Sequence, residues 1–184
     1  MPSPIVMMLT SILHNFSNIA KIGLFRKIIN YRLLLLFGIP SILLTIAGAL
    51  LTRYANLIYA EMLLAIFLTF FSLLFLLRPA LQLPANAANA ITTGSLAGFF
   101  AGFIGTGGAV RGIGLAAFNL EKNFFVGTSA AIDFGVDFSR FFVYLKNGFL
   151  QQQYYWYIPV MFIASFTGSW LGKILLGHIN QNVF

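Results

Sequence analysis

Residues 33–51 read LLLLFGIPSILLTIAGALL, an uncharged run that lies between Arg32 and Arg53. A helix needs about 20 mostly apolar residues to cross a bilayer, because hydrocarbon offers no partners for unpaired backbone groups. The run meets this requirement of length and composition. It therefore predicts a membrane-spanning helix with an arginine at each of its ends.

The rest of the chain continues in the same way on both sides of this helix. Five further stretches are long and apolar enough to be candidates for spans: 5–21, 57–77, 81–110, 124–145 and 154–172. Only 8% of the 184 residues are charged, whereas soluble domains carry about 25%. We therefore expect an all-α, polytopic integral membrane protein with about six transmembrane helices.

The formal net charge of +7 does not indicate a nucleic-acid partner. Most Lys and Arg residues stand at the ends of apolar runs, where they set the orientation of membrane proteins. If all six runs cross the membrane, one side holds Lys21, Arg26, Lys27, Arg32, Arg78 and Lys146. The other side holds Arg53, Lys122 and Lys173. We expect the six-cation side in the cytoplasm and both termini outside it.

The residue types needed for enzymatic or cofactor chemistry are scarce. The chain has no Cys and only two His residues, too few for a Cys-based or His-rich metal site. It has neither a P-loop nor a nucleophile elbow. We expect no enzyme activity, no metal and no cofactor.

Residues 94–114, GSLAGFFAGFIGTGGAVRGIG, hold more glycine than a uniform helix interior accommodates. We predict that a helix breaks here and is followed by a short re-entrant or continuing piece. The break is placed at Gly105, Thr106, Gly107 and Gly108. Backbone N–H groups at a broken helix end can receive an anion, and Arg111 adds a charge nearby. The alternative is that the glycines permit tight helix packing and that Arg111 reaches an interface.

Two parts of the chain resemble each other. TSILHNFSNIAK begins at Thr10 and TSAAIDFGVDFSR at Thr128, and polar positions correspond at an offset of 119 residues. The pairs are His14 with Asp133, Asn18 with Asp137, and Lys21 with Arg140. In each copy they occupy positions i, i+4 and i+7, one face of a helix. We expect two repeats of the same orientation, an incomplete N-terminal one over 1–80 and a C-terminal one over 81–184, as in parallel-repeat transporters.

The polar stripe Asp133, Asp137 and Arg140 is the sharpest candidate site. Ionisable residues inside a bilayer are costly and are functional by default. The hypothesis is that Arg140 attracts an anion while Asp133 or Asp137 carries a coupling proton. The structural alternatives are an Asp137–Arg140 ion pair that only fixes packing, or an Arg140 that snorkels to an interface. An intramembrane aspartic protease fits less well, because its carboxyls usually converge from separate segments.

Thr128 and Ser129 open the same polar segment. Their hydroxyls could donate hydrogen bonds to an anion, but such pairs more often cap a helix or bond a neighbouring carbonyl. We favour capping and keep both residues as candidates for anion binding.

The segments GFIGTGGAVRG, from Gly102, and GTSAAIDFGVDFSRFFVYLKNG, from Gly127, resemble the TauE/SafE sulfite-exporter family of bacterial membrane permeases. The family pattern is a glycine-rich broken segment, a loop, and a Thr-Ser pair that opens the next helix, once in each half. The second half of this chain shows the whole pattern, and TSILHNFSNIAK shows its later part. No glycine-rich segment precedes Thr10. The chain thus resembles a member without the first glycine-rich segment of its N-terminal repeat.

The resemblance implies a multi-pass permease of the cytoplasmic (inner) membrane that moves sulfite, sulfonates or related sulfur anions. We expect export, with proton coupling by Asp133 or Asp137. The expected partners are a small inorganic or organosulfur anion and the lipid bilayer, without nucleic acid. A homo-oligomer, which could rebuild an incomplete half, stays open. The alternative is a truncated or degenerate family member that does not transport.

Overall fold

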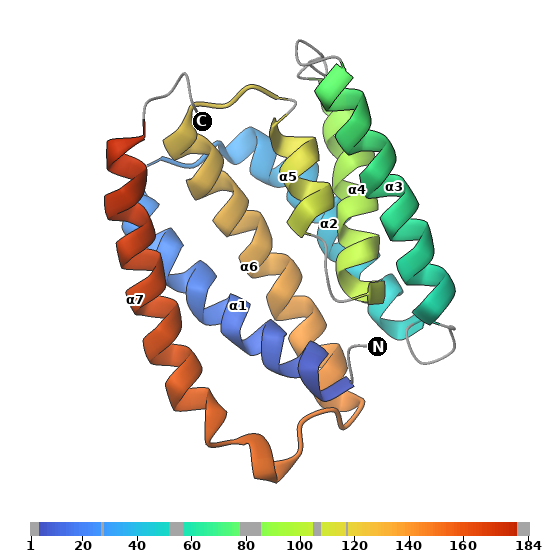
Figure 1. Ribbon diagram of the computed structural model, residues 1–184, viewed down its shortest axis with the longest axis vertical. Helices are drawn as coiled ribbons and strands as arrows, with labels where there is room; N and C mark the ends of the chain where they lie inside the picture. Colours follow the sequence, from blue (N-terminus) through green and yellow to red (C-terminus); the bar gives the residue numbers. More distant parts are fainter. Residues whose placement is uncertain are drawn as a thin grey trace.

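The computed structural model describes residues 4–26, 28–51, 57–77, 86–104, 108–116 and 118–179, which form a bundle of helices (Figure 1). The α-helices are α1 (Pro4–Phe25), α2 (Tyr31–Leu51), α3 (Leu57–Leu77), α4 (Ala87–Ile104), α5 (Gly108–Ala116), α6 (Lys122–Lys146) and α7 (Tyr157–His178). A turn of 3-10 helix covers Gln152–Tyr154, and these ranges contain no strand. The expected all-α class is confirmed.

The helices fit a membrane by length and composition. Four described segments are long and apolar enough to cross it: α1, α2, α4 and Gln152–His178, which contains α7. Large apolar side chains are exposed on the bundle surface, for example Leu35 and Leu43 on α2 and Ile163 and Leu175 on α7. Lipid favours such a surface and water does not. These features agree with the expected membrane protein, while the count of six spans, which also needs α3 and α6, stays a prediction.

The chain breaks where the glycine-rich segment predicts a break. α4 ends at Ile104 and α5 begins at Gly108. Outside the described residues lie Gly105, Thr106 and Gly107. α5 then runs back along α4, since a Cβ on Gly114 would lie 3.2 Å from Thr93, in the first half of α4 (Figure 1). The nine residues of α5 extend about 14 Å. Because α5 turns back along α4, the structure shows the predicted re-entrant piece and not the continuing one.

The earlier glycines of this segment serve helix packing. Gly94, Gly98 and Gly102 recur every four residues along α4 and lie so close to α2 that a Cβ would overlap its backbone. This close approach lets two hydroxyls of α2 donate hydrogen bonds to backbone carbonyls of α4. Ser41 Oγ donates to the carbonyl of Gly94 at 2.6 Å, and Thr45 Oγ1 donates to that of Gly98 at 2.9 Å. Tight packing and a broken helix, the two interpretations of the segment, are therefore both present.

α1 and α6 lie side by side and run in opposite directions (Figure 1). Gly127, near the start of α6, lies against Ile28, just beyond the end of α1. Tyr144, near the end of α6, shares a buried cluster with the methionines near the start of α1. The expectation of two repeats in the same orientation is therefore wrong. Because α5 returns towards the side from which α4 came, α6 runs opposite to α1, whereas repeats of the same orientation require these two helices to run in the same direction.

α1 and α7 lie side by side, and their chains run in the same direction. Ser165 Oγ donates to the carbonyl of Leu13 at 3.0 Å, and Lys173 Nζ donates to that of Leu24 at 3.2 Å. The start of α1 and the end of α7 therefore lie at opposite ends of the bundle (Figure 1). The expectation that both lie on one side of the membrane is wrong, again because α5 turns back.

The same turn redistributes the cations. Lys122 Nζ donates to the carbonyl of Leu176 at 3.1 Å, which places the start of α6 beside the end of α7. We call this end of the bundle the basic end, and its cations among the described residues are Arg26, Arg32, Lys122 and Lys173. Lys146 ends α6 at the opposite end. The expected separation of Lys122 and Lys173 from Arg26, and the expected placement of Lys146 with Arg26, are both wrong.

Candidate functional site

A cavity of about 440 Å³ lies between α1, α5, α6 and α7. Hydroxyl, amide and charged side chains contribute to its lining, including His14, Asn18, Lys21, Arg111, Asp133 and Ser169. The volume falls within the range of small-molecule sites, about 300–1,000 Å³. Its polar lining is unusual for the interior of a helix bundle in lipid and marks the cavity as the candidate site.

Arg111 and Asp133 form an ion pair at this cavity. Arg111 lies on the re-entrant helix α5, and Asp133 lies on α6. Their side chains are 15% and 10% exposed, and Ser129 Oγ donates a hydrogen bond to Asp133 Oδ2 at 3.4 Å. The turn after α4 thus brings together two predicted site residues that are 22 positions apart, and it ties α5 to α6.

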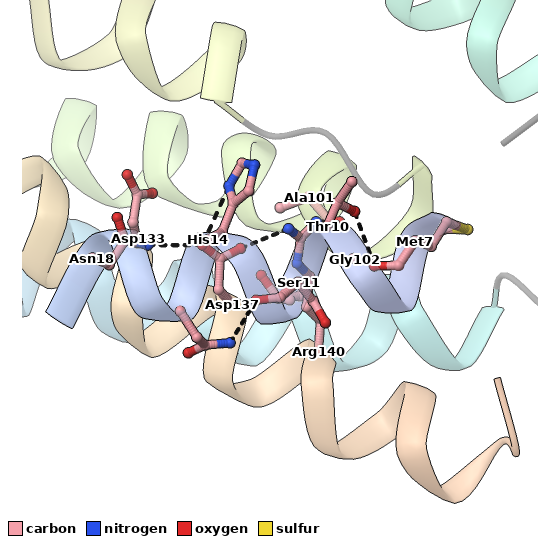
Figure 2. Close-up of polar contacts among 12 residues, drawn as sticks. Met7, Thr10, Ser11, His14, Asn18, Ala101, Gly102, Asp133, Asp137 and Arg140 are labelled. Carbon is pink, nitrogen blue, oxygen red and sulfur yellow. Dashed lines mark hydrogen bonds and ion pairs between the residues drawn. The ribbon is translucent and has the colours of Figure 1, made fainter. Parts of the chain in front are cut away.

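Asp137 lies one helical turn along α6 from Asp133, at the contact with α1 (Figure 2). Asn18 Nδ2 donates to its Oδ2 at 2.8 Å, Arg140 Nη2 is 2.8 Å from its Oδ1, and His14 Nδ1 is 3.6 Å from its Oδ2. The Asp137–Arg140 ion pair that the sequence left as an alternative is therefore present. Asp137 is held from both helices, which fixes their packing.

Arg140 is buried away from the cavity. Its side chain is 2% exposed, it is absent from the cavity lining, and its Nη1 donates to the carbonyl of Ala101 on α4 at 3.5 Å. Tyr144, one turn further along α6, donates from its hydroxyl to the carbonyl of Gly102 at 2.9 Å. Arg140 and Tyr144 together attach α6 to the end of α4.

Lys21 reaches the site from α1. Its Nζ donates to Asn18 Oδ1 at 3.0 Å, so that Asn18 joins Lys21 to Asp137. Lys21 was not predicted as a site residue. A signal was available in the repeat, because Lys21 and Arg140 correspond at the offset of 119 and each contacts the residue three positions before it.

Thr128 and Ser129 lie outside the cavity lining. Thr128 is fully buried, and its Oγ1 accepts a hydrogen bond from the backbone N–H of Asn30 at 2.9 Å. Asn30 in turn accepts from the backbone N–H of Leu33 at 3.0 Å, in the first turn of α2. Thr128 therefore holds the residue that caps α2, whereas Ser129 bonds Asp133.

The whole chain matches one protein family. The sequence model of the family described as Sulfite exporter TauE/SafE matches residues 1–184. No curated protein and no solved structure matches the chain. The resemblance carried by the glycine-rich segment and by the segment from Gly127 is confirmed.

Proposed function

Because the chain belongs to the sulfite exporter TauE/SafE family, we propose that it exports sulfite, a sulfonate or a related sulfur anion. Members of this family are membrane transporters of sulfur anions and not enzymes. The membrane proposed is the cytoplasmic (inner) membrane, with the basic end in the cytoplasm. Four cations at that end against one described cation at the other support this orientation.

The observation that carries the proposal is the Arg111–Asp133 pair at the edge of a polar cavity. A guanidinium presents parallel N–H donors that match the oxygens of an oxyanion. In an environment of low dielectric constant its attraction for an anion is stronger than in water. A bound sulfur oxyanion would compete with Asp133 for Arg111, so the cavity suits transient binding.

We assign the coupling proton to Asp133. When the anion takes Arg111, the largely buried carboxylate of Asp133 loses its ion-pair partner, and it binds a proton to become a neutral carboxylic acid. When the anion leaves, the acid gives up that proton and the pair re-forms. Asp137 retains its ion pair with Arg140 and its hydrogen bond from Asn18 throughout the transport cycle.

The break between α4 and α5 supplies the second part of the proposed binding site. Gly108 begins α5, and a Cβ at this position would lie 3.6 Å from Arg111 Nη2. The N-terminus of α5 carries partial positive charge and unpaired N–H groups. We assign anion contacts to the segment Gly105, Thr106, Gly107 and Gly108. Arg140 and Thr128 act as positioning residues through Asp137 and Asn30, and Ser129 acts through Asp133.

The proposed architecture is a pair of inverted repeats, with residues 1–80 in one and 81–184 in the other. Support comes from the packing, in which α1 contacts both α6 and α7 while α6 contacts both α1 and α2. At the offset of 119 residues α1 corresponds to α6 and α2 to α7. The contact of α1 with α7 therefore corresponds to the contact of α6 with α2, and the contact of α1 with α6 corresponds to itself. Rocking of one repeat against the other is a known route to alternating access.

Flux of radiolabelled sulfite into proteoliposomes tests the proposal. We expect uptake that responds to a pH gradient, is lost in Arg111→Gln, and loses its response to the gradient in Asp133→Asn. Arg26→Gln is the matched control, because Arg26 is exposed beyond the end of α1. Normal flux in Arg111→Gln would overturn the binding site. Absence of flux from the folded parent protein would favour the degenerate, non-transporting alternative.

A further inference from the structure

A second cavity, of about 280 Å³, adjoins the first on the side of the basic end. Phe25, Lys173 and Leu176 contribute to its lining, and all three lie at the ends of α1 and α7. Both cavities are also lined by the same four residues, which we call the shared wall: Ser17, Lys21, Gly168 and Ser169. The shared wall therefore stands between the basic end and the cavity that contains Arg111.

Lys21 is the cation of the shared wall, and among the described residues its hydrogen-bond partner is a neutral amide and not a carboxylate. In the described ranges the carboxylates of Asp133 and Asp137 pair with Arg111 and Arg140. Lys21 donates to Asn18 Oδ1, a neutral amide oxygen. The repeat explains the difference, because Asn18 holds the position that Asp137 holds for Arg140. A partly buried ammonium that is not in direct contact with a carboxylate attracts an anion.

The hydroxyls of the shared wall lie beside this charge. Ser17 Oγ on α1 is 3.3 Å from Ser169 Oγ on α7, and Ser169 Oγ is 3.4 Å from the carbonyl oxygen of Ser17. Each hydroxyl can rotate to donate to a ligand. Gly168 adds space, since a Cβ there would meet nothing within 4 Å. The shared wall thus offers one cation, two hydroxyl donors and room for a small group.

We propose that Lys21, Ser17 and Ser169 form a second anion site, through which a small sulfur oxyanion passes between the basic end and Arg111. This inference rests on the proposed function. The cations follow the path in order, with Lys173 at the outer cavity, Lys21 at the shared wall and Arg111 at the inner cavity. The ligand class is a sulfite-like or sulfonate group, whose several oxygens can accept from the ammonium and both hydroxyls.

Transport kinetics give the first test. Lys21→Gln raises the KM for sulfite by about tenfold or more, as expected when a focusing charge is removed, and changes kcat less. Lys21→Arg restores the parent KM because it keeps the charge. Lys146→Gln, an exposed change at the opposite end, leaves KM unchanged. An unaltered KM in Lys21→Gln, or no rescue by Lys21→Arg, would contradict the site.

Thiol labelling gives a second test that does not depend on transport, because the chain contains no Cys. Ser169→Cys is treated in oriented vesicles with anionic 2-sulfonatoethyl or cationic trimethylammonioethyl methanethiosulfonate. Arg26→Cys marks the basic end, and it gives the ratio of the labelling rates of the anionic and the cationic reagent at an exposed site. Ser41→Cys, buried between α2 and α4, is the unreactive control.

We expect Ser169→Cys to label from the face that labels Arg26→Cys, with a preference for the anionic reagent that disappears when Lys21→Gln is added. Labelling from the opposite face only, no labelling, or no anion preference would overturn the site while sulfite flux continued. Anion-selective labelling without sulfite flux in the parent would leave the site standing and refute the proposed function instead.

Discussion

Asn18 donates to Asp137 across 2.8 Å, and these two residues occupy corresponding positions, 119 apart, in the two related segments of the chain. In the proposed pair of inverted repeats, the pseudo-two-fold axis would pass near this hydrogen bond. The two copies differ at this point, since one supplies an amide and the other a carboxylate. Two carboxylates would repel each other here, whereas an amide and a carboxylate form a donor–acceptor pair.

Removing the amide tests how much this contact stabilises the bundle. Asn18 is 2% exposed, so Asn18→Leu leaves Asp137 with one hydrogen bond fewer in a dry environment. We expect the free energy of unfolding to fall by about 1.5–3 kcal/mol, the range for hydrogen bonds to charged groups. Unfolding in mixed detergent micelles measures it. Ile19→Leu, on the exposed side of the same helix, should leave the value unchanged, and equal stability of both variants would contradict the assignment.

For the Asp137–Arg140 pair we predict that replacing both residues costs less stability than replacing either one alone. Removing one member leaves a buried charge unpaired, which costs about 3–5 kcal/mol, whereas replacing both members by apolar residues is often neutral. We therefore expect Asp137→Leu and Arg140→Leu each to destabilise the protein strongly and the double variant to be more stable than either. A double-mutant cycle on unfolding checks this. Additive losses would show that the two residues act independently.

Much of the fold follows from the sequence because its signals are local. An uncharged run between Arg32 and Arg53 predicts α2, and α2 begins at Tyr31 and ends at Leu51. Crowded glycines predict the break, and α4 ends at Ile104. The direction of α5 is not a local property, since glycine permits either a turn or a continuation. That single choice reversed the expected repeat orientation and the expected sides of Lys122 and Lys173.

The candidate site was predictable to the same extent. Spacing at i and i+4 places Asp133 and Asp137 on one face of α6, but it does not reveal which neighbour each one meets. The pairing of Asp133 with Arg111 depends on the return of α5, and the burial of Arg140 depends on its contact with α4. The repeat matches Lys21 with Arg140, but it does not show that Lys21 contacts an amide where Arg140 contacts a carboxylate.

The α2–α4 contact yields opposite predictions for two glycines. A Cβ on Gly98 would overlap the backbone of Ser41, so Gly98→Ala pushes the helices apart, and overpacking of this kind costs about 1–3 kcal/mol. A Cβ on Gly23 of α1 would meet nothing within 4 Å. Gly23→Ala should therefore stabilise the protein by up to about 1 kcal/mol through helix propensity. Thermal unfolding in detergent compares them, and a stabilising Gly98→Ala would exclude the close contact.

α5 offers a matched pair for the anion site. A Cβ on Gly108 would lie 3.6 Å from Arg111 Nη2, and one on Gly112, a turn later, would meet nothing within 4 Å. Gly108→Leu therefore crowds the guanidinium, and a displacement that costs about 1.4 kcal/mol weakens anion binding about tenfold. Gly112→Leu should bind and transport as the parent does.

Sulfite flux and equilibrium binding by the two leucine variants separate crowding of Arg111 from a general loss of α5. If α5 merely lost its fold, both variants would fail, because both place the same side chain on the same short helix. If the glycines served only helix packing, Gly108→Leu would transport normally, since among the described residues no neighbouring helix lies within 4 Å of a Cβ there. A selective loss in Gly108→Leu is the expected result, and it would locate the anion beside Arg111 at the start of α5.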